Sequence, residues 1–319
     1  MSGICVYAEQ FGGTVESCTA ELITAAREYG DKSGSSVTVL VLGEDPSALA
    51  KQLTYPGINV AAVKTSLSAF QDDALSVAVT EALTQLKPSS VLIPASRTAR
   101  SLFSRVAVQM DVGLTADCSE LYLDEKGEFT QRKSAFGANA MCVCVEIGEP
   151  KLATIQLGVY PPCEACGEIP AVQQLTVSDI ASKVEVLEVV ESAEESITGA
   201  ELIISLGRGA LEGENLSLAK EFAKQTGGMI GGTRPLVDDG TIPFERQIGQ
   251  TGCTVHPKVC LYFGVSGAIQ HTEGVRDAKL TIAVNSDPDA AVFGYADYGV
   301  AADMGPVLRA LLALYPGEG

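Results

Sequence analysis

The sequence contains no tryptophan and only two histidines, His256 and His271. Without tryptophan there is little sign of a large aromatic platform for a substrate. The two histidines form neither an HExxH motif nor a suitably spaced pair of zinc ligands. A Walker loop and a recognisable Ser/His/Asp set are also missing. We therefore predict a protein with no metal site and no acid–base machinery for chemistry on a bound substrate.

Basic residues are scarce: 22 Lys and Arg stand against 40 Asp and Glu, a formal net charge of -18 at pH 7. Nucleic-acid binding needs a basic surface that displaces counterions from phosphates. The charge balance therefore argues against nucleic acid as a partner, and the acidic surface mainly keeps the chain soluble.

Long hydrophobic runs are absent too. No apolar stretch reaches the roughly 18 residues that span a bilayer. The sequence does not open with a basic segment followed by an apolar core. We predict that the chain is cytoplasmic and does not insert into a membrane.

Cysteine occurs nine times, an odd number, and residues such as Cys5 and Cys260 stand in apolar runs. Reduced, buried thiols are the simplest interpretation. Cys163 and Cys166 form a CxxC pair that could be a redox centre or half a zinc site. No second CxxC accompanies it, so we interpret it as an incidental loop pair and keep a thiol redox protein as an alternative.

At 319 residues and 33.2 kDa the chain exceeds the usual size of one hydrophobic core, which predicts two domains. In the first half, strand-like runs rich in Val and Ile alternate with two helical patterns, one stopping at Gly30 and one before Pro88. This alternation predicts a parallel sheet with right-handed crossovers. The strand-like runs are 4–9, 36–43, 58–65 and 89–96.

Three later segments, 120–137, 139–147 and 151–160, alternate polar and apolar residues and predict antiparallel strands. The glutamate-rich stretch 184–198 is interpreted as a linker. A second α/β domain then begins with ELIISL and ends on an amphipathic helix at MGPVLRALLALY. We predict two Rossmann-like, doubly wound α/β domains with mainly parallel sheets, 1–190 and 199–319.

Glycine-bearing and polar turns cluster in the last third of the chain, and several follow a strand-like run. Ligands of open α/β sheets bind at the edge where the strands end. We therefore predict a nucleotide cofactor site in the second domain. The turns are GRG (207–209), GGTR (231–234), QIGQTG (247–252), SGAIQH (266–271), NSD (285–287) and ADYGVAADM (296–304).

In SGAIQH, a strand ends at Ser266 and Gly267, and 268–271 is expected to enter a helix. Backbone N–H groups at such a helix start attract an anion, which suits a pyrophosphate. The alternative is that Gly267 only makes a tight turn. Arg208 and Arg234, next to glycines, could approach a flat ring closely, or could be ordinary solvated charges.

Other polar residues of these turns suit the remaining parts of a nucleotide. Gln250 and Thr251 fit the edge of a heterocycle, although QTG is also an ordinary turn. His271 could donate to a carbonyl oxygen or become cationic, or could be a satisfied structural residue. For ribose hydroxyls or adenine the candidates are Asn285 and Asp303, ahead of Asp287 and Asp297.

Together these motifs resemble those of the alpha subunit of the electron-transfer flavoproteins. That family carries, in this order, GRG, a G-x-SR turn, QVGQTG, SGAIQH, an AINKD-like strand end and ADYG. The first domain is similar more loosely, through VLIPASRTARSLFSRVA and QRKSAFGANA. In this sequence Thr233 replaces the family's serine, while Cys253 and Ser286 replace lysines.

The resemblance implies one FAD in the second domain and a beta chain that pairs with the first. It implies Arg208 and Arg234 beside the isoalloxazine ring, Thr251 near flavin N5 and His271 toward the C2 carbonyl. A cation there would stabilise the negative charge that reduction places on the ring. The implied FAD-binding residues are Arg208, Thr233, Arg234, Ile248, Gly249, Gln250, Thr251, Ser266, Gly267, Ala268, Ile269, Gln270, His271, Asn285, Asp303 and Met304.

The function we predict is that of an electron-carrying subunit in a heterodimer with an electron-transfer flavoprotein beta chain. It would shuttle electrons between flavoprotein dehydrogenases, such as acyl-CoA dehydrogenases, and an acceptor, with the linker as a hinge. One alternative is a subunit of an electron-bifurcating, NADH-dependent acyl-CoA reductase or dehydrogenase complex. Another, from a different class, is a non-redox adenine-nucleotide-binding module.

Overall fold

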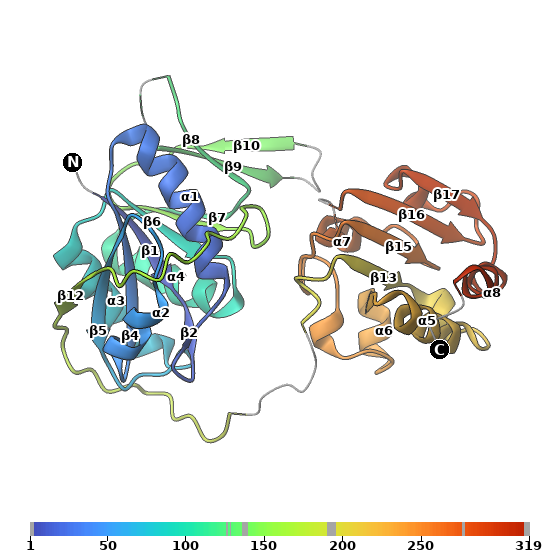
Figure 1. The fold of residues 1–319 in the computed structure, drawn as a ribbon, viewed down its shortest axis with the longest axis horizontal. Helices are drawn as coiled ribbons and strands as arrows, with labels where there is room; N and C mark the ends of the chain where they lie inside the picture. The colour runs from blue at the N-terminus through green and yellow to red at the C-terminus, as the bar shows by residue number, and fades with distance from the viewer. Residues whose placement is uncertain are drawn as a thin grey trace. The chain divides into compact units, whose positions relative to one another are not determined.

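The structure is a computed structural model, and it describes residues 3–125, 127, 129–135, 140–189, 196–275 and 278–315. The chain divides into two compact units, 1–189 and 190–319 (Figure 1). Each unit is an α/β fold built around a parallel sheet, as the sequence predicts. No helix in the described ranges is long and apolar enough to cross a membrane.

The first unit contains a sheet of seven parallel strands. From β1 the chain first adds strands on one side, starting with β4, and then crosses to add strands on the other side, starting with β6. This is the doubly wound arrangement. In order across the sheet the strands are β12 (Ala171–Leu175), β5 (Ile58–Lys64), β4 (Val37–Gly43), β1 (Ile4–Ala8), β6 (Ser90–Pro94), β11 (Lys151–Ile155) and β7 (Leu114–Cys118).

Helices cover both faces of this sheet. In β4, Val39 and Val41 pack toward one cluster, and Leu40 and Leu42 pack toward the other. The continuous apolar run of this strand has the composition expected when both faces are buried. The first cluster includes side chains of α1 (Cys18–Ser33) and α2 (Pro46–Gln52), and the second those of α3 (Asp72–Leu86) and α4 (Arg97–Met110).

Two local predictions in this unit are wrong. Helix α1 passes through Gly30 and ends at Ser33, because Gly34 at φ 66° takes the left-handed conformation that caps the helix. The segment 151–155 is not antiparallel: it forms β11 and inserts parallel between β6 and β7. Leu152, Ala153 and Ile155 are buried there, so the apparent alternation did not mark a solvent face.

The antiparallel prediction is confirmed for β8 (Glu120–Leu123), β9 (Phe129–Ala135) and β10 (Ala140–Cys144), which form a separate three-stranded sheet. Part of the QRKSAFGANA segment, 136–139, lies outside the described residues. The same holds for 190–195 in the predicted linker. At the end of that linker, Ile197 is fully buried in the second unit's core, so this unit begins earlier than the predicted 199.

The second unit contains five parallel strands: β14 (Met229–Gly232), β13 (Leu202–Leu206), β15 (Val259–Phe263), β16 (Leu280–Asn285) and β17 (Tyr298–Ala301), in that order. Helices α5 (Asn215–Thr226) and α8 (Met304–Leu314) pack over one face. The other face is covered by loops and short 3-10 helices, through residues such as Ile248, Val255 and Val292. This leaves the carboxyl ends of four strands to line a pocket.

Candidate functional site

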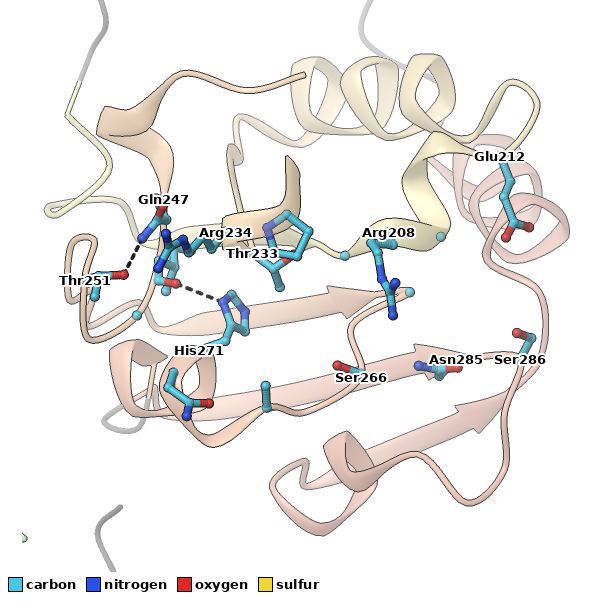
Figure 2. Close-up of a pocket in the computed structure, with 18 residues that line it drawn as sticks. Arg208, Glu212, Thr233, Arg234, Gln247, Thr251, Ser266, His271, Asn285 and Ser286 are labelled. Carbon is cyan, nitrogen blue, oxygen red and sulfur yellow. Dashed lines mark hydrogen bonds between the residues drawn. The ribbon is translucent and has the colours of Figure 1, made fainter. Parts of the chain in front are cut away.

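A pocket of about 600 Å³ lies at the carboxyl edge of the second unit's sheet (Figure 2). Its walls come from the turns after β13, β14, β15 and β16 and from the loop 247–251. This is the edge at which open α/β sheets bind ligands. The lining residues are Gly207, Arg208, Gly209, Glu212, Thr233, Arg234, Pro235, Gln247, Ile248, Gly249, Thr251, Gly264, Ser266, Ala268, Gln270, His271, Asn285 and Ser286.

Glycines allow the turns after β13 and β15 to touch. A Cβ on Gly207 would lie 2.1 Å from the carbonyl oxygen of Gly264, and one on Gly209 would lie 3.1 Å from the Gly264 Cα. Real Cβ atoms do not approach backbone as closely as 2.1 Å, so Gly207 needs the bare backbone, and a Cβ on Gly209 would make a tight contact that displaces its neighbour slightly. The glycines of GRG therefore serve backbone packing here, in addition to any access they give Arg208.

The GGTR turn presents Arg234 at the start of the short helix α6 (Arg234–Asp238). Its side chain is 67% exposed, and its Nε lies 3.4 Å from a carboxylate oxygen of Asp238. An exposed pair of this kind contributes little to stability. The guanidinium therefore remains accessible to a ligand in the pocket.

Charges and polar groups are spread along the pocket rather than gathered at one point (Figure 2). Arg234, with Gln247, Thr251 and His271, lies at one end, and Arg208 and Ser266 lie farther along. Glu212, Asn285 and Ser286 occupy the opposite end. Both arginines line the pocket, at different points along its length.

The loop 247–251 is held by its own hydrogen bonds. The Gln247 side-chain amide donates to the Thr251 hydroxyl at 2.8 Å, and the backbone N–H of Gln250 donates to the carbonyl of Gln270 at 2.8 Å. Gly249 has φ 133°, and a Cβ there would lie 2.3 Å from that same Gln270 carbonyl oxygen. The loop is thus fitted closely against 270–271 before any ligand arrives.

His271 is buried, and both ring nitrogens have partners. Nδ1 lies 3.0 Å from the carbonyl oxygen of Ile248, and Nε2 lies 2.8 Å from the hydroxyl of Ser205. Burial lowers the pKa of His271 to about 4, partly offset by the hydrogen bond to Ile248. The neutral ring must donate from Nδ1, because a carbonyl only accepts, so Nε2 accepts from Ser205. His271 thus has the satisfied structural role that the sequence left open, although it also lines the pocket.

Eleven of the sixteen predicted site residues line the pocket, and five do not: Gln250, Gly267, Ile269, Asp303 and Met304. Three of these five residues have structural roles next to the pocket: Gly267, Asp303 and Met304. Gly267 has φ 88°, and a Cβ there would lie 2.1 Å from the backbone nitrogen of Val292. The Asp303 carboxylate caps α8 by accepting from the N–H of Gly305 at 2.9 Å, and Met304 is buried.

The remaining acidic candidates have structural partners. The Asp297 carboxylate accepts from the N–H and hydroxyl of Thr281 at 2.8 and 2.9 Å, and these bonds lower its pKa. Asp287 shapes a turn, because its N–H donates to the Asn285 side chain at 2.9 Å. Asn285 itself lines the pocket and donates to the carbonyl of Val265 at 2.7 Å.

Several lining residues are not among the predicted site residues. Gln247 and Ser286 stood inside recognised motifs, but Glu212, Pro235 and Gly264 were not singled out. Glu212 follows GRG by three residues, and only the turn of the 3-10 helix Arg208–Leu211 brings it to the pocket. No spacing in the sequence marks that turn as part of a site.

The CxxC pair lies in the first unit, and both thiols are free. Cys166 donates to the carbonyl of Thr54 at 3.3 Å, and an Arg27 nitrogen lies 3.5 Å from the sulfur of Cys163. Within the described ranges, no cluster of three or more His, Cys, Asp or Glu could hold a metal ion.

The pocket suits a flavin dinucleotide. Its volume falls in the roughly 300–1,000 Å³ range of cofactor sites. Arg208 and Ser266, away from the ends, match a pyrophosphate, and Arg234 and Thr251 offer a cation and a hydroxyl to the polar edge of a ring. The opposite end offers Glu212, Asn285 and Ser286 to a sugar or base.

Comparison with known proteins agrees with this arrangement. Residues 4–185 match the electron transfer flavoprotein domain, and residues 196–276 match the electron transfer flavoprotein FAD-binding domain. Protein FixB of Clostridium saccharobutylicum is 34% identical, covering 98% of this chain and 95% of that protein. The electron transfer flavoprotein subunit alpha of Thermoanaerobacterium thermosaccharolyticum is 33% identical, covering 97% and 96%.

A third relative is the lactate dehydrogenase (NAD(+),ferredoxin) subunit LctC of Acetobacterium woodii. It is 32% identical, covering 99% of this chain and 77% of that protein. The matches span both units, and the FAD-binding match includes most of the turns that line the pocket. The chain therefore belongs to the electron-transfer flavoproteins, as an alpha subunit that binds FAD.

Proposed function

We propose that this chain pairs with a beta-type chain and carries electrons, through FAD held in the pocket, between flavoprotein dehydrogenases and an acceptor. The observation that carries the proposal is the hydrogen bonding of His271. It is the pocket's one histidine among the described residues, and both of its nitrogens are already bonded. His271 therefore acts as a structural link in the pocket wall, and the other polar side chains of the pocket are left to bind a ligand.

Each part of the pocket has a role in this proposal. FAD, when bound, supplies one- and two-electron transfer. Arg208 and Ser266 hold the pyrophosphate, and Thr251 orients the ring edge. Arg234 stabilises negative charge on the reduced ring, and Asn285 binds toward the adenosine.

A cytoplasmic location and acyl-CoA dehydrogenase donors belong to the same proposal. All nine cysteines are free in the structure, which fits a reducing compartment. The choice of donor comes from the family to which the chain belongs.

A second candidate is a subunit of an NADH-dependent reductase or dehydrogenase complex. Two relatives favour it: the LctC subunit, and the acryloyl-CoA reductase electron transfer subunit beta of Anaerotignum propionicum, which is 32% identical. In such a complex a second flavin in the beta-type chain would receive electrons from NADH. The two candidates therefore differ in the number of flavins per heterodimer.

The test is to purify the chain with its beta-type partner, count the flavins and follow visible absorbance during stepwise reduction. One FAD, reduced by an acyl-CoA dehydrogenase with its substrate, supports the carrier. Two FAD, the second reduced by NADH, support the complex. A folded heterodimer that takes up no flavin in excess FAD would overturn both proposals.

A further inference from the structure

Glu212 is the only acidic side chain among the described residues that line the pocket. It lies at the end opposite Arg234, and its carboxylate points toward the region of Ser286 (Figure 2). A carboxylate is an unexpected lining group in a pocket for a cofactor with two phosphates, because it repels them. Its position therefore says which part of the ligand lies beside it.

The backbone of Glu212 is fixed before a ligand binds. Its N–H donates to the carbonyl of Gly209 at 3.3 Å, and its own carbonyl accepts from the N–H of Asn215 at 3.1 Å. The buried Asn215 side chain donates to the same Gly209 carbonyl at 2.9 Å. The turn that presents Glu212 is thus held in one conformation, and little backbone ordering remains for a ligand to impose.

The carboxylate itself is uncommitted. Within the described part of the chain it has no hydrogen-bond or salt-bridge partner, and it does not pair with Arg208 four residues earlier. By contrast, Glu214 pairs with Arg309 on α8, and Glu201 pairs with Lys258. Glu212 and Arg208 are therefore opposite charges that face different parts of the same pocket.

An ionised carboxylate only accepts hydrogen bonds, so the ligand group beside it must be a donor. With the pyrophosphate near Arg208, the donors available at this end are the ribose hydroxyls and the adenine amino group. We infer that Glu212 recognises the adenosine half of FAD and excludes nucleotides that carry a further phosphate on the adenosine ribose. This inference rests on the proposed assignment of the pocket to FAD. An acidic residue that accepts from ribose hydroxyls while repelling phosphate is established chemistry in dinucleotide sites.

The experiment uses the full chain with its beta-type partner after removal of FAD. The dissociation constants of FAD and of FMN, which lacks the adenosine, are measured by flavin fluorescence for the wild type and Glu212→Gln. ADP and adenosine 2′,5′-bisphosphate are then compared as competitors. Glu214→Gln is the matched control, because Glu214 lies two residues away and outside the pocket lining.

We expect Glu212→Gln to raise the dissociation constant of FAD about tenfold, which corresponds to the loss of one charge-assisted hydrogen bond. The dissociation constant of FMN should not change. The preference for ADP over the bisphosphate should shrink in this variant, and Glu212→Lys should reverse it. Unchanged FAD affinity in Glu212→Gln, with Arg208→Ala still weakening FAD, would overturn the role of Glu212 and leave the pocket assignment intact. If neither variant affects FAD, both the inference and the assignment fall.

Discussion

The hydroxyl of Ser205 on β13 lies 2.8 Å from Nε2 of His271 on α7 (Ile269–Thr272), and the same ring reaches the carbonyl of Ile248 at 3.0 Å. One neutral imidazole on α7 thus joins strand β13 to the loop 247–251. Ser205 is fully buried and His271 is 4% exposed, so both bonds are shielded from solvent. The pocket wall depends on this chain of two hydrogen bonds.

Replacing Ser205 with alanine should lower the free energy of unfolding by about 1–3 kcal/mol, because Nε2 of His271 is left buried without a donor. Urea unfolding followed by circular dichroism measures the loss. In a His271→Gln background, Ser205→Ala should lower the free energy of unfolding much less, because the imidazole that accepts from Ser205 is already absent. Equal costs in the two backgrounds would show that the 2.8 Å contact contributes nothing.

The pH dependence of stability should carry the signature of His271. Its folded pKa of about 4 lies below the ordinary value near 6.5, so the unfolded chain binds the proton more readily. The stability that this residue contributes is complete above about pH 6.5 and declines as pH falls toward 4, by about 3 kcal/mol at most. Unfolding at pH 7.5 and pH 5 should show a smaller difference in His271→Gln than in the wild type. The same measurement on His256→Gln controls for loss of a histidine as such.

Arg234→Ala should make the bound flavin harder to reduce. The exposed guanidinium attracts a charge at 4 Å by roughly 1 kcal/mol in water and roughly 4 kcal/mol at a dielectric near 20. These energies correspond to about 40 and 170 mV in a one-electron couple, and the 67% exposure of the side chain favours the smaller value. Spectroscopic redox titration measures the shift, and Arg234→Lys should retain most of the potential. An unchanged potential in Arg234→Ala would favour a non-redox nucleotide-binding module.

Gly249→Ala should lower stability and FAD retention far more than Gly240→Ala, although both glycines have positive φ. A Cβ at Gly249 would lie 2.3 Å from the Gln270 carbonyl oxygen, whereas at Gly240 nothing lies within 4 Å. Gly240→Ala therefore costs only backbone strain, about 1–2 kcal/mol, and should keep FAD. Gly249→Ala must displace the loop 247–251, so FAD retention after gel filtration should be lost. Retention equal to that of Gly240→Ala would contradict the close fit of the loop.

Much of the fold followed from local pattern. The Val-rich runs that became β1, β4, β5 and β6, and the strand at Leu202–Leu206, were identified because strands buried on both faces need continuous apolar sequence. β11 was misassigned, because alternation in its sequence resembles a half-exposed strand although the segment is buried. The end of α1 was misplaced because Gly34, and not Gly30, adopts the positive φ of a helix cap, and the sequence does not display φ.

By itself the sequence determined which turns carry glycine and polar side chains, and its motifs were sufficient to indicate the family and FAD. Only the tertiary structure decided how those turns meet. It placed Glu212 in the pocket, separated Arg208 from Arg234, and turned His271 into a buried link between Ser205 and Ile248. The physical reason is that strand order and the backbone contacts at glycines determine where each of these side chains lies. Strand pairing and glycine contacts join segments that are far apart in the chain, so the spacing of residues within one motif does not predict them.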